Sequence, residues 1–261
     1  MIKMKLKNVL VVYYVHNYNT LELVERELRA KGVPYKCISR AKCNNAIVKK
    51  RDLIIIVGGD GTFLRTSHHI YDETPVMTVS SDTGINEGFF TRSSKDDFAR
   101  KLSRIISGKY RIRKLPRLEA RINRKKIGML AVNEIFVGSS HQYHTSRYEI
   151  TVHGKKEQQK SSGVLITTKA GSTGWAGSAA KKKLVIPEHG FGYVVREPYF
   201  GRLTKPKLLQ GTLGKNEKIK VKSGTHRGIA VIDSSYTEHR FIDGDSIEVK
   251  ISKKPIHLVE F

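Results

Sequence analysis

The sequence has few cysteines and no long apolar segment. Only two of its 261 residues are cysteines, Cys37 and Cys43, and their spacing matches neither a zinc site nor a disulfide framework. We therefore expect a reduced, cytoplasmic setting. The longest apolar segment, residues 9–15, is far shorter than the ~20 residues that cross a bilayer, and the N-terminus lacks the pattern of a signal peptide. We expect no membrane partner.

Acidic side chains are also scarce. The chain has 24 Asp and Glu against 48 Lys and Arg, which gives a formal net charge of +24. Such an excess attracts polyanions. Residues 1–115 hold 22 basic and 11 acidic side chains and residues 116–261 hold 26 and 13, so the charge is not gathered in a basic tail. We therefore expect small polyanions as partners and no nucleic acid.

The first part of the chain alternates between apolar, strand-like segments and amphipathic helices. Segments that are apolar throughout are typical of parallel strands covered on both faces, so this pattern predicts an α/β domain with a parallel sheet. Strands are expected at residues 9–15, 35–39, 52–57 and 75–80, and helices at 21–32, behind the N-cap pair Asn19-Thr20, and at 94–106, behind a Ser94/Asp97 capping pair.

After about residue 110 the helical periodicity nearly disappears. Short strand-like segments and turns replace it, which predicts an all-β, β-sandwich-like second domain. We place the domains at residues 1–115 and 116–261, and consider a return of the final segment to the first domain. The strands are expected at 118–122, 127–137, 148–152, 164–168, 219–221, 228–232 and 247–251, with turns at 123–125, 153–155 and, as a hairpin, 243–245.

The strongest motif is Val-Gly-Gly-Asp-Gly-Thr at the end of an apolar strand. Gly58, Gly59 and Gly61 let the backbone approach a phosphate closely, and Thr62 opens a helix whose N-terminal amides favour an anion. The carboxylate of Asp60 repels phosphate, so we expect it to hold Mg²⁺ or to accept a proton from an attacking hydroxyl. The alternative is a tight structural turn. The preceding strand favours phosphate chemistry, because ligands bind at the carboxyl ends of parallel strands.

Two further motifs lie in the β-rich part. Asn133-Glu134 could read the polar edge of a base or a ribose, although a strand with one polar pair is an equally simple interpretation. Residues 167–178 (TTKAGSTGWAGS) offer amides, hydroxyls and the Lys169 ammonium to a phosphate or ribose, without the spacing of a P-loop. The alternative is a flexible connector. Trp175 is either a core residue, which we slightly favour, or a stacking surface.

These three motifs, in this order and spacing, resemble the NAD kinase family over roughly residues 9–245. The resemblance implies an α/β domain followed by a β-sandwich-like domain. It also implies transfer of a phosphoryl group from ATP, or from polyphosphate, to the 2′-hydroxyl of the adenosine ribose of NAD, which makes NADP. It further implies a divalent cation such as Mg²⁺ and a homodimer or homotetramer.

The resemblance also assigns roles to residues. Asp60 matches the general base, Asn133 and Glu134 match the pair that holds the adenosine of NAD, and Gly58, Gly59, Gly61 and Thr62 match the phosphate loop. The core of the later loop is matched by Gly171, Ser172 and Thr173. Lys160 and Lys169 are expected to neutralise phosphate charge. We also expect NAD contacts from Lys160, Ser162, Gly174, Trp175 and Ser178.

The sequence departs from the common family pattern in three places. Lys160-Ser161-Ser162-Gly163 stands where an Arg-Ser-Asp-Gly run is common, so Ser162 replaces an aspartate that binds NAD. Residues 168–175 (TKAGSTGW) replace Thr-Pro-Thr-Gly-Ser-Thr-Ala-Tyr, and residues 83–90 match Asn-x-Gly-x-x-Gly-Phe-Leu loosely. The sequence is more similar to a divergent branch, the mitochondrial-type NAD kinases and bacterial relatives described as predicted sugar kinases.

Two alternatives to an NAD kinase stay open at this point. One is a related small-molecule or lipid kinase with another hydroxyl acceptor, since such enzymes share a GGDGT-like loop but generally lack the Asn-Glu pair and the later loop. The other is a protein without catalysis that binds nucleotides or nucleic acid, against which the intact Asp60 counts.

Overall fold

The computed structural model describes residues 5–80, 88–141 and 143–261. The chain divides into two compact units, one formed by Met1–Leu115 with Lys254–Phe261 and the other by Pro116–Lys253. None of the described helices is both long and apolar enough to span a bilayer. The expected succession of an α/β part and a β-rich part is confirmed.

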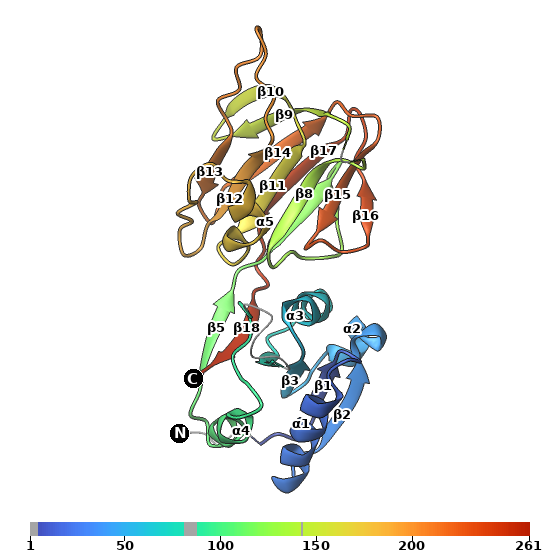
Figure 1. Cartoon of the computed structure of the whole chain (residues 1–261), viewed down its shortest axis with the longest axis vertical. Coiled ribbons are helices and arrows are strands. Elements are labelled where there is room, and N and C mark those ends of the chain that lie inside the picture. Colours follow the sequence, from blue (N-terminus) through green and yellow to red (C-terminus); the bar gives the residue numbers. More distant parts are fainter. Residues whose placement is uncertain (1–4, 81–87, 142) are drawn as a thin grey trace. The chain divides into compact units, whose positions relative to one another are not determined.

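The first unit is built on a six-stranded, mostly parallel sheet with the order β2-β1-β3-β4-β18-β5. Four strands follow the apolar segments of the sequence, and β18 from the end of the chain pairs parallel to β4 and antiparallel to β5. Figure 1 shows β18 beside β5. The strands are β1 (Val9–Tyr13), β2 (Tyr35–Ser39), β3 (Leu53–Val57), β4 (Pro75–Val79), β5 (Arg111–Leu115) and β18 (Ile256–Glu260).

Helices cover this sheet because both of its faces are apolar. In β3 every residue from Leu53 to Val57 is buried, as expected for a central parallel strand. Leu21, Val24 and Leu28 of α1 and Phe98 of α4 pack into one core with the sheet. The helices are α1 (Tyr18–Ala30), α2 (Asn45–Val48), α3 (Asp60–Ser67) and α4 (Phe98–Ile106), with a 3-10 turn η1 (Arg40–Lys42) after β2.

The second unit is a sandwich of two antiparallel sheets, ordered β10-β9-β14-β17-β6-β7 and β13-β12-β11-β8-β15-β16. Alternate residues of both sheets meet in one large core, in which Ile150, Ile166, Val221 and Val249 are nearly inaccessible to solvent. We call the two sheets the outer lysine sheet and the motif sheet, because the first carries the exposed lysines of β14 and the second carries the Asn-Glu motif.

Helix α5 (Trp175–Ala179) covers part of the other face of the motif sheet, where Ala176 packs with Phe136, Leu165 and Val194 (Figure 1). The strands of this unit are β6 (Leu118–Ile122), β7 (Lys125–Lys126), β8 (Glu134–Ser139), β9 (Ser146–Val152), β10 (Lys155–Ser161), β11 (Gly163–Thr168), β12 (Phe191–Arg196), β13 (Gln210–Leu213), β14 (Lys218–Ser223), β15 (Gly228–Ile232), β16 (Glu238–Arg240) and β17 (Ser246–Ile251), with a 3-10 turn η2 (Gly171–Thr173) after β11.

Two helices begin at other residues than the sequence suggests. Helix α1 begins at Tyr18, and its N-cap is Asn17 instead of the Asn19-Thr20 pair, because the chain turns directly after β1. Helix α4 begins at Phe98 and not at residue 94. The Asp97 carboxylate accepts the N–H of Ser94 at 2.9 Å and so stabilises a turn in front of the helix.

Two predictions in the β-rich part are wrong for a common reason. Residues 127–137 do not form one strand, because residues 127–133 carry the chain from β7 in one sheet to β8 in the other. The turn at 243–245 is not a hairpin, because β16 and β17 also belong to different sheets. A sandwich requires such crossings, which local periodicity does not reveal.

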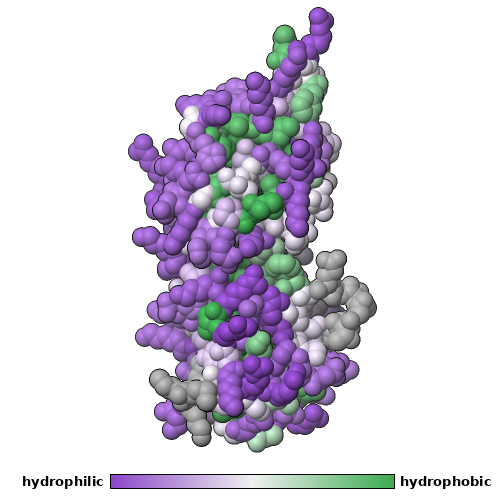
Figure 2. Space-filling model, turned by 90° about the vertical axis from the view of Figure 1, so that its left-hand side faces the viewer, coloured by the Kyte–Doolittle hydropathy of each residue, from purple (hydrophilic) through white to green (hydrophobic). Residues whose placement is uncertain are grey.

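Hydrophilic residues cover most of the face shown in Figure 2, with hydrophobic groups between them. This matches the high proportion of charged residues, which is 28% of the chain.

Candidate active site

The GGDGT motif lies where the parallel sheet reverses its strand order. The order β2-β1-β3-β4 means that the chain moves to one side after β1 and to the other side after β3. The loops that follow these two strands therefore separate at the carboxyl edge of the sheet, which is the usual place for a ligand in an open α/β sheet. Residues 14–17 follow β1, and Gly58 and Gly59 follow β3.

Gly58 makes the close turn from β3 into α3. Its φ is +149°, and a Cβ at this position would lie 2.7 Å from the Thr62 hydroxyl oxygen. Its N–H donates to the carbonyl of Val79 at 3.0 Å, which ties the loop to β4. Any larger residue would separate the loop from the first turn of α3, so the amides at the start of this helix depend on glycine.

The carboxylate of Asp60 is held in a defined position. The N–H of Phe89 donates to one oxygen and the N–H of Phe90 to the other, both at 3.0 Å. The ring of Phe90 stacks on Phe63 of α3 with the ring centroids 4.5 Å apart, which fixes this segment against the helix. Each carboxylate oxygen keeps a free lone pair in this arrangement and can still accept a proton or a hydrogen bond from a ligand.

Arg40 brings a positive charge to the same loop, and the sequence motifs did not include it. Its guanidinium lies 3.7 Å from the centroid of the Tyr14 ring, and its Nη1 donates to the Thr62 hydroxyl at 3.4 Å. Tyr14 follows β1 and Arg40 follows β2, so both lie at the carboxyl edge of the sheet. The only signal in the sequence was a basic residue directly after a short strand. Residues 83–87 of the loosely matched family segment lie outside the described residues.

In the second unit, an aspartate that the sequence analysis did not identify binds the backbone N–H groups of the Asn-Glu motif. The Asp233 carboxylate accepts the N–H groups of Val132, Asn133 and Glu134 at 2.8, 2.7 and 3.1 Å. The N–H of Asp233 in turn donates to the carbonyl of Glu134 at 2.9 Å. Its φ of +47° belongs to the turn after β15. These hydrogen bonds of Asp233, which we call the Asp233 clamp, join the start of β8 to the end of β15.

The later loop packs directly against the same motif. The N–H of Thr168 donates to the carbonyl of Asn133 at 2.8 Å, and the Thr168 hydroxyl donates to the carbonyl of Val132 at 2.6 Å. A Cβ on Gly171 would lie 2.4 Å from the carbonyl oxygen of Asn133. The structure therefore brings the second and third motifs together, and glycine at position 171 is required for that contact.

Two polar groups at this junction are suited to a ligand. Among the described residues, the side-chain carbonyl oxygen of Asn133 is buried and has no hydrogen-bond partner. Buried polar atoms normally have partners, so this oxygen is an acceptor whose lone pairs are unused. Burial of Glu134, and next to it the charge of Asp233, raise the pKa of the Glu134 carboxyl to about 7.

Trp175 lies on the surface and not in the core. It is 37% exposed, its ring stacks on Phe136 with the centroids 5.3 Å apart, and the Arg196 guanidinium lies 4.9 Å from its ring centroid. The core interpretation of Trp175 is therefore wrong. The ring offers a flat surface next to a positive charge.

Ser162 and Lys160 lie at the opposite end of β11 from Asn133 and Glu134. Thr167 of β11 pairs with Glu134, whereas Gly163 at the start of that strand follows Ser162. The strand separates its two ends by roughly 17 Å at ~3.4 Å per residue. Lys160 lies on β10 of the outer lysine sheet. The expected contacts of Lys160 and Ser162 with NAD are thus not part of the cluster around Asn133.

The remaining loop residues are more open. Lys169 pairs with the Glu188 carboxylate at 2.8 Å, and the Ser172 hydroxyl donates to the carbonyl of Lys169 at 2.8 Å. Besides Lys169, Trp175 and Gly177, the exposed positions of the loop are Thr173, Gly174 and Ser178. Each of these three residues is open to solvent.

The fold itself is shared with known kinases. A solved NAD kinase from Archaeoglobus fulgidus in complex with ATP is similar with a TM-score of 0.77 at 24% identity, over 97% of this chain and 93% of that chain. A yeast NADH kinase complexed with NADH is similar with a TM-score of 0.78 at 20% identity, over 98% of this chain and 84% of that chain. The fold is therefore that of the NAD and NADH kinases.

Sequence comparison finds similar kinases. The model of the ATP-NAD kinase N-terminal domain matches residues 2–110. A probable NADH kinase of Oryza sativa subsp. japonica is 27% identical over 91% of this chain and 79% of its own length, and the NAD kinase of Thermoplasma volcanium is 27% identical over 80% and 74%. The first part of the chain thus matches the ATP-NAD kinase N-terminal domain, and the chain is similar to NAD and NADH kinases over most of its length.

Proposed function

We propose that this protein is an NAD kinase, which transfers a phosphoryl group from ATP or polyphosphate to the 2′-hydroxyl of the adenosine ribose of NAD. The observation that carries the proposal is the GGDGT loop at the strand-order reversal, with the Asp60 carboxylate held by two backbone N–H groups. A fixed carboxylate can accept the hydroxyl proton as the phosphoryl group moves. The similarity to NAD and NADH kinases supports the same activity.

The first unit supplies the groups for the phosphoryl donor. Gly58, Gly59 and Gly61 leave the backbone open, and the start of α3 favours negative charge. Arg40 adds a guanidinium beside Thr62, where it can bind phosphate oxygens through paired N–H donors. We propose that these residues bind the donor phosphates.

We propose that the divalent cation binds together with the phosphates of the phosphoryl donor. Within the described ranges, no group of three or more His, Cys, Asp or Glu side chains could hold a metal ion. Mg²⁺ commonly binds through substrate phosphates, waters and one or two carboxylates, and Asp60 supplies one carboxylate. When bound, the ion neutralises phosphate charge. No protein metal cluster is needed for that chemistry.

The second unit supplies the groups for the acceptor. The unpartnered oxygen of Asn133 and the carboxyl of Glu134 can accept hydrogen bonds from the amino and hydroxyl groups of adenosine. Trp175 with Arg196 provides a surface on which a ring can stack. Lipid kinases with a GGDGT-like loop generally lack the Asn-Glu pair, so these groups favour NAD over a lipid acceptor.

An assay of NADP formation from NAD with ATP, and separately with polyphosphate, tests the proposal. General-base catalysis contributes ~10²–10⁴-fold, so Asp60→Asn should lower kcat by about that factor while the chain stays folded. Full activity of Asp60→Asn would remove Asp60 as the base. A folded wild type that forms no more NADP than this variant would contradict NAD as the acceptor.

We further propose that NADH is also an acceptor, which the names of the rice and yeast relatives support. The same assay with NADH tests this point. We place the enzyme in a reducing compartment such as the cytoplasm. Burial raises the pKa of Cys37 and Cys43 to about 11, which keeps both free thiols unreactive. A homodimer or homotetramer follows from the family resemblance, and light scattering of the purified protein measures it.

A further inference from the structure

The exposed face of the outer lysine sheet gathers positive charge that the proposed kinase reaction does not use. Residues alternate along β14, so that Ile219, Val221 and Ser223 are buried while the lysines between them are exposed. The strand pairings place further basic side chains on the same face. Its basic members are Arg121, Lys126, Arg147, Lys156, Lys160, Lys218, Lys220, Lys222 and Lys250, and its acidic members are Glu119, Glu149 and Glu248.

Two of the three carboxylates of this face are each shared by two lysines, and the third, Glu149, accepts a hydrogen bond from the Gln158 side chain at 3.2 Å. Glu248 lies 3.0 Å from the ammonium of Lys218 and 3.6 Å from that of Lys220. Glu119 lies 2.9 Å from the ammonium of Lys126 and 3.5 Å from that of Lys250. One carboxylate cannot neutralise two ammonium groups, so the face keeps a clear positive charge. That charge opposes contact with a second copy of the same face.

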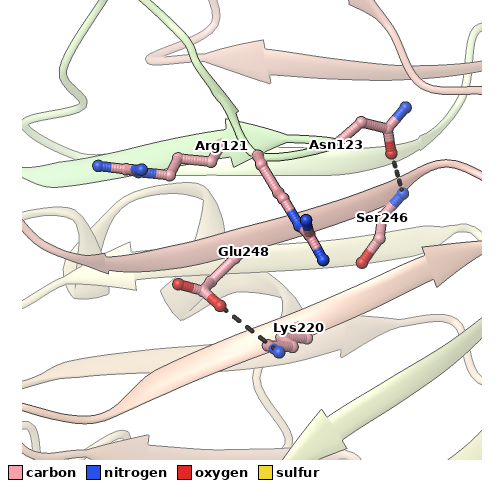
Figure 3. A pocket seen from close by; sticks show the side chains of 6 residues that line it. Arg121, Asn123, Lys220, Ser246 and Glu248 are labelled. Carbon is pink, nitrogen blue, oxygen red and sulfur yellow. Dashed lines mark hydrogen bonds and ion pairs between the residues drawn. The ribbon is translucent and has the colours of Figure 1, made fainter.

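A hollow of about 760 Å³ lies in this face and is lined by Arg121, Asn123, Arg124, Lys220, Ser246 and Glu248. Figure 3 shows Arg121, Lys220 and Glu248 on neighbouring strands around it, and the Asn123 side chain bonded to the backbone of Ser246. This bond, at 2.9 Å, fixes the turn that carries Arg124. All the residues that line the hollow are thus polar or charged, and none is apolar.

The charges extend in two dimensions. One row runs directly across six strands through Lys156, Thr151, Lys220, Glu248 and Arg121 to Lys126 on the last strand. At ~4.8 Å between strands this row spans roughly 24 Å, and the lysines along β14 are ~7 Å apart. Glu248 interrupts the row, so a thin linear polyphosphate finds no continuous cationic line.

We propose that this face binds the phosphate backbone of double-stranded nucleic acid without sequence preference. A duplex presents phosphates over an area of this size, whereas a single strand is usually held by stacking on aromatic rings. The outward positions of β6, β9, β10, β14 and β17 among the described residues hold no aromatic side chain. The proposal does not depend on the kinase activity.

Fluorescence anisotropy with a labelled 24-base-pair DNA of mixed sequence tests the proposal over a range of KCl concentrations. The test variant carries Lys218→Gln, Lys220→Gln and Lys222→Gln. The control carries Lys31→Gln, Lys36→Gln and Lys49→Gln, which removes the same charge from exposed lysines of the first unit. Melting temperature and NADP formation show that both variants are folded.

We expect the wild type to bind with a strong salt dependence. The test variant should lose at least tenfold in affinity, and its slope against log salt should fall by about 2–3, since each phosphate contact contributes ~0.9. The control should stay within about twofold of the wild type. Equal losses in both variants, or no binding by the wild type, would overturn the proposal. So would binding of polyphosphate at this face with no binding of the duplex.

Discussion

At the scale of single residues, the two key carboxylates lie in contrasting environments. Asp60 accepts two backbone hydrogen bonds at the edge of a sheet, whereas Glu134 is buried beside a second carboxylate. Burial, and next to it the charge of Asp233, favour the neutral form of the Glu134 carboxyl. Glu134 is therefore one residue through which the stability of the fold depends on pH.

The stability of the protein should depend on pH through Glu134. Because its pKa of about 7 in the folded chain lies above the ordinary value of 4.5, the folded state favours the protonated form. The free energy of unfolding should therefore fall as the pH rises from about 4.5 to 7. Glu134→Gln removes this pH-dependent fall in the free energy of unfolding. The substitution should therefore stabilise the protein at pH 8 by up to roughly 3 kcal/mol, with little effect at pH 4.5.

Urea unfolding of both proteins at pH 4.5 and pH 8 measures the difference. Glu238→Gln, on an exposed strand position, is the matched control and should follow the wild type at both pH values. If Glu134→Gln and the wild type lose the same stability between these pH values, Glu134 is not the group responsible.

At the scale of elements, the site in the second unit depends on the clamp between β8 and β15. Asp233→Asn keeps the size of the side chain and tolerates the positive φ, but its amide nitrogen cannot accept a hydrogen bond. A buried N–H group then lacks its partner, so the free energy of unfolding should fall by about 1–3 kcal/mol. We also expect the KM for NAD to rise more than kcat falls, because Asn133 and Glu134 lose their position.

A purely structural role for Asp233 can be separated from this positioning role. Since the charge of Asp233 raises the pKa of Glu134, Asp233→Asn should also shift the pH dependence of stability to lower pH. Asp243→Asn, on an exposed turn, serves as the control. A variant that is less stable but keeps the wild-type KM and pH profile would show that the clamp does not position the site.

At the scale of the whole molecule, the end of the chain completes the first sheet. β18 lies between β4 and β5, and its Ile256, Leu258 and Val259 are fully buried. A chain that ends at Lys253 loses these three side chains, each of which contributes roughly 1.5–3 kcal/mol. It also leaves the edge of β4 unpaired. The first unit should therefore unfold at a much lower temperature.

Circular dichroism melting and limited proteolysis measure this effect. Cleavage of the shortened chain should concentrate in residues 1–115, while residues 116–253 stay resistant. Removal of Phe261 alone takes away one partly buried ring that packs against the same core, and should lower the melting temperature much less. An unchanged melting temperature in the chain that ends at Lys253 would show that the first sheet does not need β18.

The sequence allowed correct prediction of the features that depend on neighbouring residues. The apolar segments at β1, β3 and β4 and the alternation in β14 follow from local pattern, and so does the GGDGT turn, since a buried strand followed by two glycines leaves few alternatives. The local hydrophobic pattern gave a wrong prediction at residues 127–137, where we expected one strand. The same apolar composition occurs in a strand and in a segment that crosses between two sheets.

The sequence by itself therefore determined the succession of an α/β part and a β-rich part, the family resemblance, and the motif residues Asp60, Asn133 and Glu134. These rest on periodicity and on short spacings along the chain. Only the tertiary structure revealed Arg40 beside Thr62, the Asp233 clamp and the lysines gathered on one sheet face. These groups come from distant segments, and only strand pairing and register bring them together.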